Sequence, residues 1–170
     1  MKHKIKTALI SVSDKTNLLN ILDVLKKYKV KIISSGGTYK SIKKLGYRCT
    51  EVSSYTGFKE MLDGRVKTLH PKIYAGILHD RSNRKHTTEM TKQKFPSIDL
   101  IIVNFYPFQK IVTSSKNNRK IIENIDIGGP TMVRAAAKNF KNVLIVTNKN
   151  DYPDLIDEIE KNKGQTSLKF

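Results

Sequence analysis

The sequence predicts an α/β protein with a doubly wound, mainly parallel sheet flanked by helices. Short apolar runs typical of buried strands alternate with stretches whose apolar residues recur at helical spacing. Up to residue 52 the order is strand, helix, strand, helix, strand, and right-handed crossovers turn such an order into a parallel sheet covered on both faces. In addition, three of the apolar runs end abruptly in clusters of small polar residues and lysine or asparagine.

The elements of the first half follow from this periodicity. The first helix is the clearest, because Leu18, Leu22 and Leu25 fall on one helical face. Gly46 marks the end of the second helix. The predicted elements are a strand at 5–12, a helix at 16–28, a strand at 30–34, a helix at 38–45 and a short strand at 49–52.

The second half begins with a long irregular stretch. Residues 53–85 are rich in glycine, proline, threonine and charge and show little periodicity, so we expect a loop region there. A loop of this length inside a compact domain is usually functional. Beyond it the pattern predicts helices and strands at 85–94 (helix), 100–103 (strand), 117–123 (helix), 131–139 (helix), 143–146 (strand) and 152–161 (helix).

Length and composition indicate one globular domain at 1–170. A hydrophobic fraction of 38% allows a real core, and the longest apolar run, at 100–103, is far too short to span a bilayer. The basic start of the chain is not followed by the apolar segment that a signal peptide needs, so a cytoplasmic location without membrane contact is expected. Cys49, the only cysteine, is expected to be a small core residue.

The net charge of +17 is typical of proteins that bind nucleic acids, so that function is kept as an alternative. However, only six of the 32 basic residues are arginines, and the lysines are dispersed over the presumed solvent faces of the helices. No zinc-finger, RNP or helix-turn-helix motif is present. A coding bias toward A and T could account for the lysines, and no specific nucleic-acid partner is expected.

The three polar clusters are predicted to face one pocket, because the carboxyl ends of parallel strands share one edge of the sheet. The first two also precede helical patterns, so their free backbone N–H groups suit a phosphate. Ordinary structural roles are open as well: Ser13 and Asp14 as helix N-caps, and Gly36-Gly37 as a tight turn. The clusters are Ser11-Val12-Ser13-Asp14-Lys15-Thr16, Ser34-Ser35-Gly36-Gly37-Thr38 and Asn104-Phe105-Tyr106-Pro107.

Two further motifs complete a set of five. They are Gly64-Arg65-Val66-Lys67-Thr68-Leu69-His70-Pro71, and Asp126-Ile127-Gly128-Gly129-Pro130-Thr131 leading to Ala135-Ala136-Ala137-Lys138-Asn139. In order and at similar spacing, the five closely resemble the IMP cyclohydrolase domain of the bifunctional purine biosynthesis proteins, over about residues 5–160. The resemblance implies a methylglyoxal-synthase-like fold, in agreement with the fold class predicted from periodicity.

The resemblance also implies an activity. Members of this family carry out the last step of purine biosynthesis, the dehydrative closure of 5-formamidoimidazole-4-carboxamide ribonucleotide (FAICAR) to IMP. They are homodimers that act on a purine nucleotide, and this step needs no cofactor. Their second domain is a transformylase that uses 10-formyltetrahydrofolate. That domain is absent from this sequence, and the cyclohydrolase region is expected to be truncated at its C-terminal end.

By resemblance, Lys67, Tyr106, Asp126 and Lys138 fall on the catalytic positions of the family. The hypothesis is that Asp126 accepts the carboxamide proton, that Lys67, Tyr106 and N–H groups at 65–68 hold the oxyanion, and that Lys138 protonates the departing water. Which lysine has which role stays open. The expected nucleotide contacts are Ser11, Ser13, Asp14, Lys15, Ser35, Gly36, Gly37, Thr38, Arg65, Val66, Thr68, Val103, Asn104, Ile127 and Gly128, with the phosphate near the first two polar clusters.

Each of these residues also has a plain structural interpretation. Asp126 could simply stabilise the start of a helix with Pro130 in its first turn. Tyr106-Pro107 could be a strand end that packs, and Arg65, Lys67 and Lys138 could be surface charges. The histidines lack the paired spacing of metal ligands, so no metal site is expected. The alternative functions are a non-catalytic nucleotide- or phosphate-binding module of the same fold, and a basic nucleic-acid-binding protein.

Overall fold

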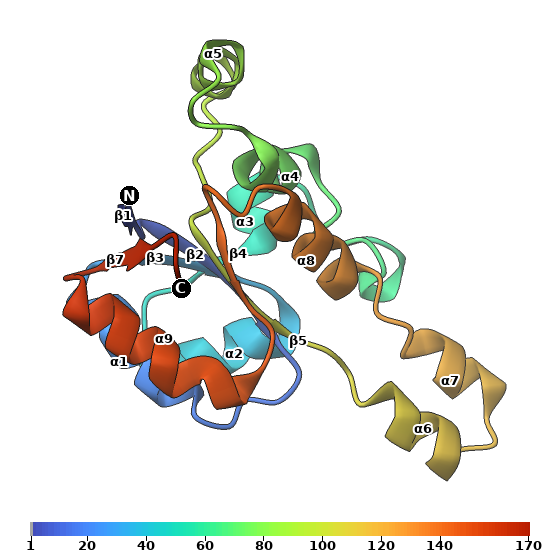
Figure 1. Ribbon diagram of the computed structural model, residues 1–170. Coiled ribbons are helices and arrows are strands. Elements are labelled where there is room, and N and C mark those ends of the chain that lie inside the picture. Colours follow the sequence, from blue (N-terminus) through green and yellow to red (C-terminus); the bar gives the residue numbers. More distant parts are fainter. Residues whose placement is uncertain (1) are drawn as a thin grey trace.

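The computed structural model describes residues 2–170, and its centre is a sheet of five parallel strands. The strands are β2 (Thr7–Val12), β3 (Lys31–Ser34), β4 (Thr50–Glu51), β5 (Leu100–Asn104) and β6 (Leu144–Val146). Their order in the sheet is β4-β3-β2-β5-β6 (Figure 1). Because the chain builds first toward one edge and then toward the other, the sheet is doubly wound and its topological switch point lies between β2 and β5.

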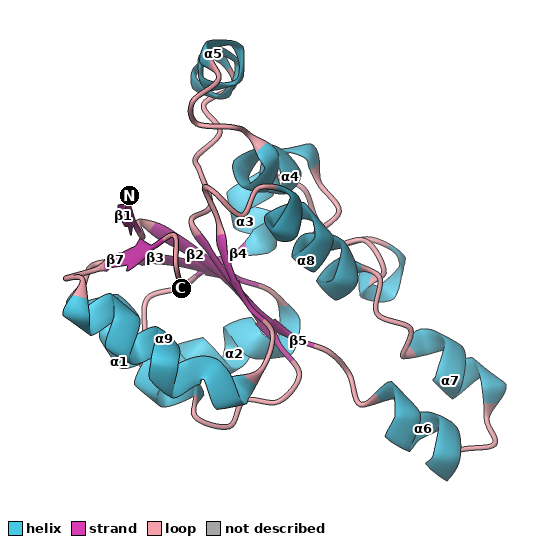
Figure 2. Ribbon diagram, in the orientation of Figure 1, coloured by secondary structure: helices cyan, strands magenta, loops and turns pink. Residues whose placement is uncertain are grey.

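Helices cover both faces of the sheet (Figure 2). Alternate strand residues point to opposite faces, so Ile10 and Ile102 pack on one side and Leu9 and Ile101 on the other. The first side is covered by α1 (Leu18–Lys27), α2 (Gly36–Lys44) and α9 (Tyr152–Lys161). The second side is covered by α3 (Val52–Thr56), α4 (Pro71–Leu78) and α8 (Gly128–Lys138). These two apolar layers form the core.

Three helices lie outside these layers. The helix α5 (Arg84–Lys92) buries only Met90. The helices α6 (Phe108–Ser114) and α7 (Asn118–Glu123) bury no residue and extend beyond the carboxyl end of β5 (Figure 1). We call residues 108–123 the α6–α7 arm. At the opposite end of the sheet, β1 (Lys2–Lys4) pairs with β7 (Gln165–Ser167) and brings the two ends of the described chain together.

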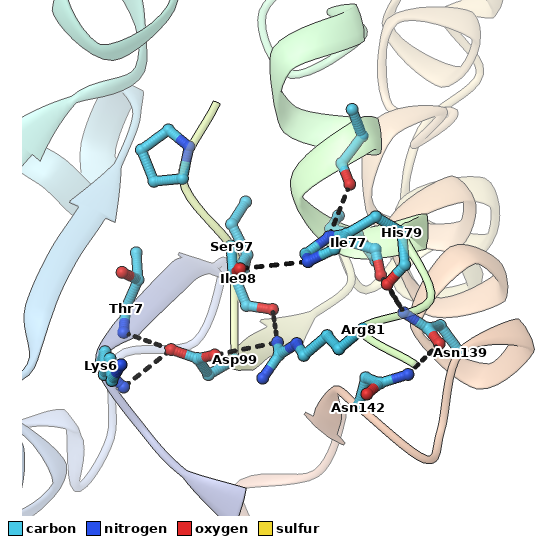
Figure 3. Close-up of polar contacts among 12 residues, drawn as sticks. Lys6, Thr7, Ile77, His79, Arg81, Ser97, Ile98, Asp99, Asn139 and Asn142 are labelled. Atoms are coloured by element: carbon cyan, nitrogen blue, oxygen red, sulfur yellow. Dashed lines mark hydrogen bonds and ion pairs between the residues drawn. The ribbon is translucent and has the colours of Figure 1, made fainter. Parts of the chain in front are cut away.

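A buried polar network lies at the amino end of β5, where Asp99 is only 6% exposed (Figure 3). Its carboxylate accepts hydrogen bonds from the amides of Lys6 (2.7 Å) and Thr7 (2.8 Å) and pairs with Arg81 at 2.9 Å. The Asn139 amide, just after α8, donates to the carbonyls of Ile77 and His79 at the end of α4. The network therefore ties the carboxyl ends of α4 and α8 to the sheet edge opposite the polar clusters.

The fold class predicted from the sequence is confirmed, and so are most elements. The loop predicted at 53–85 is wrong, because this stretch contains α3, α4 and the 3-10 turn η1 (Leu62–Gly64). α4 is too short for periodicity to reveal it, although His70 caps it and Pro71 begins it. The predicted strand at 49–52 is shorter, since Val52 already begins α3. No pattern in the sequence indicated β1, α6, β7 or the 3-10 turn η2 (Lys149–Asp151).

The structure also tests two smaller expectations, on the first helix cap and on Cys49. Ser13 and Asp14 do not cap the first helix, because α1 begins at Leu18 with Asn17 as its N-cap. Cys49 is partly buried and packs against the core, and burial raises the pKa of its thiol to about 11. Within residues 2–170, every helix is too short or too polar to cross a membrane.

Candidate functional site

A cavity of about 530 Å³ lies outside the carboxyl ends of β2, β3 and β5. Its volume suits a small-molecule ligand, and its position beside the switch point is the usual one for such sites. All three polar clusters contribute to it, as the sequence predicted. The lining residues are Ser11, Val12, Ser13, Lys15, Ser35, Gly36, Gly37, Thr38, Asp63, Gly64, Arg65, Lys67, Thr68, Leu69, Asn104, Tyr106, Ile122, Glu123, Ile125, Asp126, Ile127, Gly128, Gly129 and Met132.

The loop after β2 is fixed by a side chain from the end of β5. The Asn104 amide oxygen accepts hydrogen bonds from the backbone N–H groups of Ser13 (2.7 Å) and Asp14 (2.9 Å). Its amide nitrogen donates to the Asp14 carbonyl at 2.8 Å. The Lys15 ammonium donates to the Ser13 carbonyl at 3.1 Å. Asn104 therefore sets the shape of this loop in addition to lining the cavity.

Asp14, an expected nucleotide contact, is turned to other partners. Its carboxylate pairs with Lys149 at 2.6 Å and accepts hydrogen bonds from the Thr16 amide and hydroxyl. These hydrogen bonds, the one from Lys149 above all, hold the pKa of the Asp14 carboxyl well below its usual range. Asp14 does not line the cavity, so its own contribution is to the structure of the loop.

The second cluster forms the amino end of α2. Ser35 is the N-cap and makes no side-chain capping hydrogen bond, and the first turn holds no acidic residue. The Thr38 hydroxyl accepts from the Val12 amide and donates to the Val12 carbonyl, which fixes the turn to the end of β2. A nine-residue helix whose uncapped amino end borders a cavity suits an anionic group.

Lys67 reaches this same end of α2 from the loop that follows η1. The chain turns tightly through η1 before it: Met61 bridges Val66, and Leu62 and Asp63 of η1 both have positive φ. A Cβ added to Gly36 would lie 3.3 Å from the Lys67 ammonium nitrogen. The ammonium therefore lies directly beside the first residue of α2.

Asp126 lies at the amino end of α8 and accepts a hydrogen bond from the Gly129 amide at 2.9 Å. The plain interpretation of Asp126 as a residue that stabilises the start of a helix therefore agrees with the structure, and Asp126 lines the cavity as well. A Cβ on Gly128 would lie only 2.7 Å from the Thr68 hydroxyl. Glycine at this position lets the end of α8 pack closely against the loop of Lys67.

Arg65 joins the same loop to the α6–α7 arm. Its guanidinium donates two hydrogen bonds to the carboxylate of Glu123, the last residue of α7. The pair holds the pKa of Glu123 below its usual value and raises that of Arg65. Both side chains are largely exposed, so the pair fixes geometry more than it adds stability. The Arg65 side chain therefore lines the cavity while its guanidinium is already paired with Glu123.

Three of the four expected catalytic residues, Lys67, Tyr106 and Asp126, line one cavity. Lys138 does not: it is exposed and is the last residue of α8, about 15 Å along an 11-residue helix from the end that borders the cavity. The expected convergence of all four is thus incomplete within one chain. Val66 and Val103 also lie outside the lining, and Val103 is a core residue at 1% exposure.

Sequence reasoning missed several residues of the site. Glu123 and Ile125 line the cavity, and their place just before the Asp126 motif was the only signal for them. Glu60 does not line the cavity, but it forms an ion pair with Lys67 at 3.3 Å. It lies four residues before a motif that was singled out, in a stretch expected to be irregular. The expectations of no metal and no cofactor stay predictions.

The family model of the MGS-like domain matches residues 17–131. The chain belongs to the MGS-like domain family. This MGS-like domain is 47% identical over 167 residues to the bifunctional purine biosynthesis protein PurH of Bradyrhizobium diazoefficiens. It is 51% identical over 157 residues to the protein of the same name from Clostridium acetobutylicum. The alignments cover 98% and 92% of this chain but 32% of each relative, so the domain spans about a third of their length.

A solved structure supports the same assignment. The crystal structure of ForH matches this MGS-like domain with a TM-score of 0.83 and 30% identity, over 94% of this chain and 80% of that one. The resemblance seen in the five motifs is therefore confirmed at the level of the family, and the domain is related to purine biosynthesis enzymes. The homodimer and the cytoplasmic location stay predictions.

Proposed function

We propose that this MGS-like domain is an IMP cyclohydrolase, which closes the second ring of FAICAR with loss of water. The main supporting observation is that Lys67, Tyr106 and Asp126, from three distant segments, line one cavity. Similarity to the bifunctional purine biosynthesis protein over nearly the whole chain also supports it. A non-catalytic nucleotide-binding module would need the phosphate cradle but would have no use for this set of groups.

The 5′-phosphate of the nucleotide would lie at the uncapped amino end of α2. The first N–H groups of a helix are free to bind an anion, and the helix dipole favours negative charge at this uncapped end. Ser13 and Lys15 would complete the cradle from the β2 loop, whose shape Asn104 fixes. The base would then lie toward Ile127 and Gly128 at the end of α8.

The chemistry joins the carboxamide nitrogen to the formyl carbon and breaks the bond from that carbon to its oxygen. The oxygen leaves as water, and the carboxamide and formamide nitrogens lose one proton each. The carboxamide nitrogen is a poor nucleophile, so a base must take its proton as it attacks the formyl carbon. Asp126 would be that base, since the Gly129 amide orients its carboxylate at the cavity. Lys67 and Tyr106 would donate to the negative charge that develops on the formyl oxygen. Both reacting groups sit on one ring, so orientation supplies much of the acceleration.

The proposal keeps Lys138 as the proton donor to the departing water, as in the resemblance. That role requires Lys138 to reach the bound nucleotide, whereas in the single chain its side chain lies outside the cavity, at the last residue of α8. The Lys138→Ala variant tests it separately from the other three residues. Normal turnover of this variant would remove Lys138 from the mechanism and leave the proposed activity standing.

An ultraviolet assay of FAICAR conversion tests the activity with the purified chain. We expect IMP to form, and we expect Lys67→Ala to lower kcat about 100-fold or more, in the range found when an oxyanion donor is removed. Lys43→Ala, which removes an exposed lysine at the far end of α2, serves as the control and should behave as wild type. A folded protein that binds IMP but leaves FAICAR unchanged would instead be the non-catalytic module.

A further inference from the structure

The end of the Lys67 side chain lies close to two glycines. A Cβ on Gly64 would fall 2.4 Å from Lys67 Cε and 2.8 Å from its Nζ, and a Cβ on Gly36 would fall 3.3 Å from Nζ. Both glycines have positive φ, 89° and 54°. The lysine thus lies against bare backbone at both glycines, and a side chain at position 64 would push it out. Glycine backbone does nothing to balance the charge of the ammonium.

The location of that charge is unfavourable without a partner. Nζ lies beside Gly36, the first residue of α2, where the helix carries its partial positive charge and no acidic side chain. Glu60 supplies the balance, since its Oε2 lies 3.3 Å from Nζ. Within residues 2–170 it is the only carboxylate that pairs with Lys67. The second carboxylate oxygen of Glu60, Oε1, lies near Gly64, at 3.2 Å from the position that a Cβ would take there.

We propose that Glu60 is a positioning residue, whose carboxylate keeps the Lys67 ammonium at the amino end of α2 and directed at the cavity. A lysine side chain has four rotatable bonds, and the Lys67 side chain is 32% exposed, so water competes for it. Glu60 does not line the cavity, and it therefore acts through Lys67 and not by touching the nucleotide. The inference rests on the proposed cyclohydrolase function and names a further residue that this function needs.

Glu60→Gln tests the proposal, because it keeps the size of the side chain and removes its charge. We expect kcat for ring closure to fall about tenfold while KM stays within about twofold, since the loss falls on the transition state and Ser13, Lys15 and the Ser35 to Thr38 turn are unchanged. Glu60→Asp, which keeps the charge, should recover part of kcat. Glu89→Gln is the matched control, because Glu89 is exposed on α5 and forms no ion pair among the described residues.

Two further measurements separate positioning from a general structural role. In a Lys67→Ala background, Glu60→Gln should cause no additional loss, because residues that act as one unit are not additive. The acylation rate of Lys67, followed by mass spectrometry relative to Lys43, needs no turnover. We expect this rate to rise in Glu60→Gln, since the freed amine spends more time in water, and to stay unchanged in Glu89→Gln.

The proposal fails if Glu60→Gln keeps wild-type kcat and Lys67 labelling. It also fails if kcat falls by the same factor with and without Lys67, or if KM rises and the unfolding temperature drops along with kcat. If the wild-type protein does not close the ring at all, the proposed function itself is wrong and Glu60 positions nothing for it. That result is distinct, because it shows in the wild type before any variant is made.

Discussion

Two neighbouring glycines at the amino end of α2 have different roles. Gly36 has a φ of 54°, a conformation that other residues adopt only at a cost, and its bare Cα faces the Lys67 ammonium. Apart from its chain neighbours and its own helix backbone, Gly37 has no atom within 4 Å of the place where a Cβ would be, and its φ is not positive. The sequence shows the pair as one turn or phosphate motif, and only the backbone conformation tells the two residues apart.

Gly36→Ala and Gly37→Ala therefore make a matched pair. We expect Gly36→Ala to lower the free energy of unfolding by about 1–2 kcal/mol, because an L-residue is strained in the left-handed region. It should also slow ring closure, because the new methyl group disturbs Lys67. Gly37→Ala should be neutral or stabilising by up to about 1 kcal/mol, since alanine favours a helix. Urea denaturation measures the free energy of unfolding of both variants, and equal changes in the two would contradict this account.

At the scale of elements, the end of α4 shows how a short helix becomes part of the fold. His79 follows α4 and is 8% exposed, with Nδ1 3.0 Å from the Ala75 carbonyl and Nε2 3.2 Å from the Ser97 hydroxyl (Figure 3). Burial lowers the pKa of His79 below its ordinary value of 6.5. The side chain is therefore buried in its neutral form, as the packing of α4 against α8 and the 97–99 segment requires.

This burial makes stability depend on pH. The unfolded chain binds a proton at His79 more readily than the folded one, so the stabilising contribution is complete above about pH 6.5 and is lost as the pH falls through the lower folded pKa. We expect the urea midpoint of the wild type to decrease from pH 7.5 to pH 5.5. His79→Gln should start lower but lose less over the same interval. A variant as pH-sensitive as the wild type would show that other groups are responsible.

At the scale of the whole molecule, the α6–α7 arm is the least integrated part of the fold. It buries no side chain, and its apolar residues Phe108, Val112 and Ile122 are 41%, 45% and 56% exposed. Helices this short are only marginally stable in water, and exposed apolar residues add nothing to their stability. A second copy of this chain would cover them, in line with the homodimer that the family resemblance implies.

We therefore predict that the chain self-associates through the arm. Light scattering should give about twice the monomer mass of 19.4 kDa, and salt should favour the dimer, because two chains of net charge +17 repel each other. Val112→Asp should yield monomers. Leu45→Asp is the matched control, because Leu45 is equally exposed at 45% but lies after α2, away from the arm. Dimers that persist in Val112→Asp would place the interface elsewhere.

The sequence by itself determined the parallel sheet, its main helices and the edge at which a ligand would bind. Apolar runs and helical periodicity are local signals, and the ends of parallel strands meet by topology alone, so β2, β3 and β5 could be placed without coordinates. The five ordered motifs also pointed to the family. The short helices α4 and α6 gave no such signal, because neither is long enough to show a period.

Only the tertiary structure decided which of the residues in the five motifs share a cavity. It joined Lys67, Tyr106 and Asp126, left Lys138 at the far end of α8, and paired Lys67 with Glu60. These outcomes depend on backbone conformation and side-chain direction, such as the positive φ of Gly36 and Gly64 and the contact of Glu60 with Lys67. Such features arise from contacts between distant segments, so no local pattern of residues contains them.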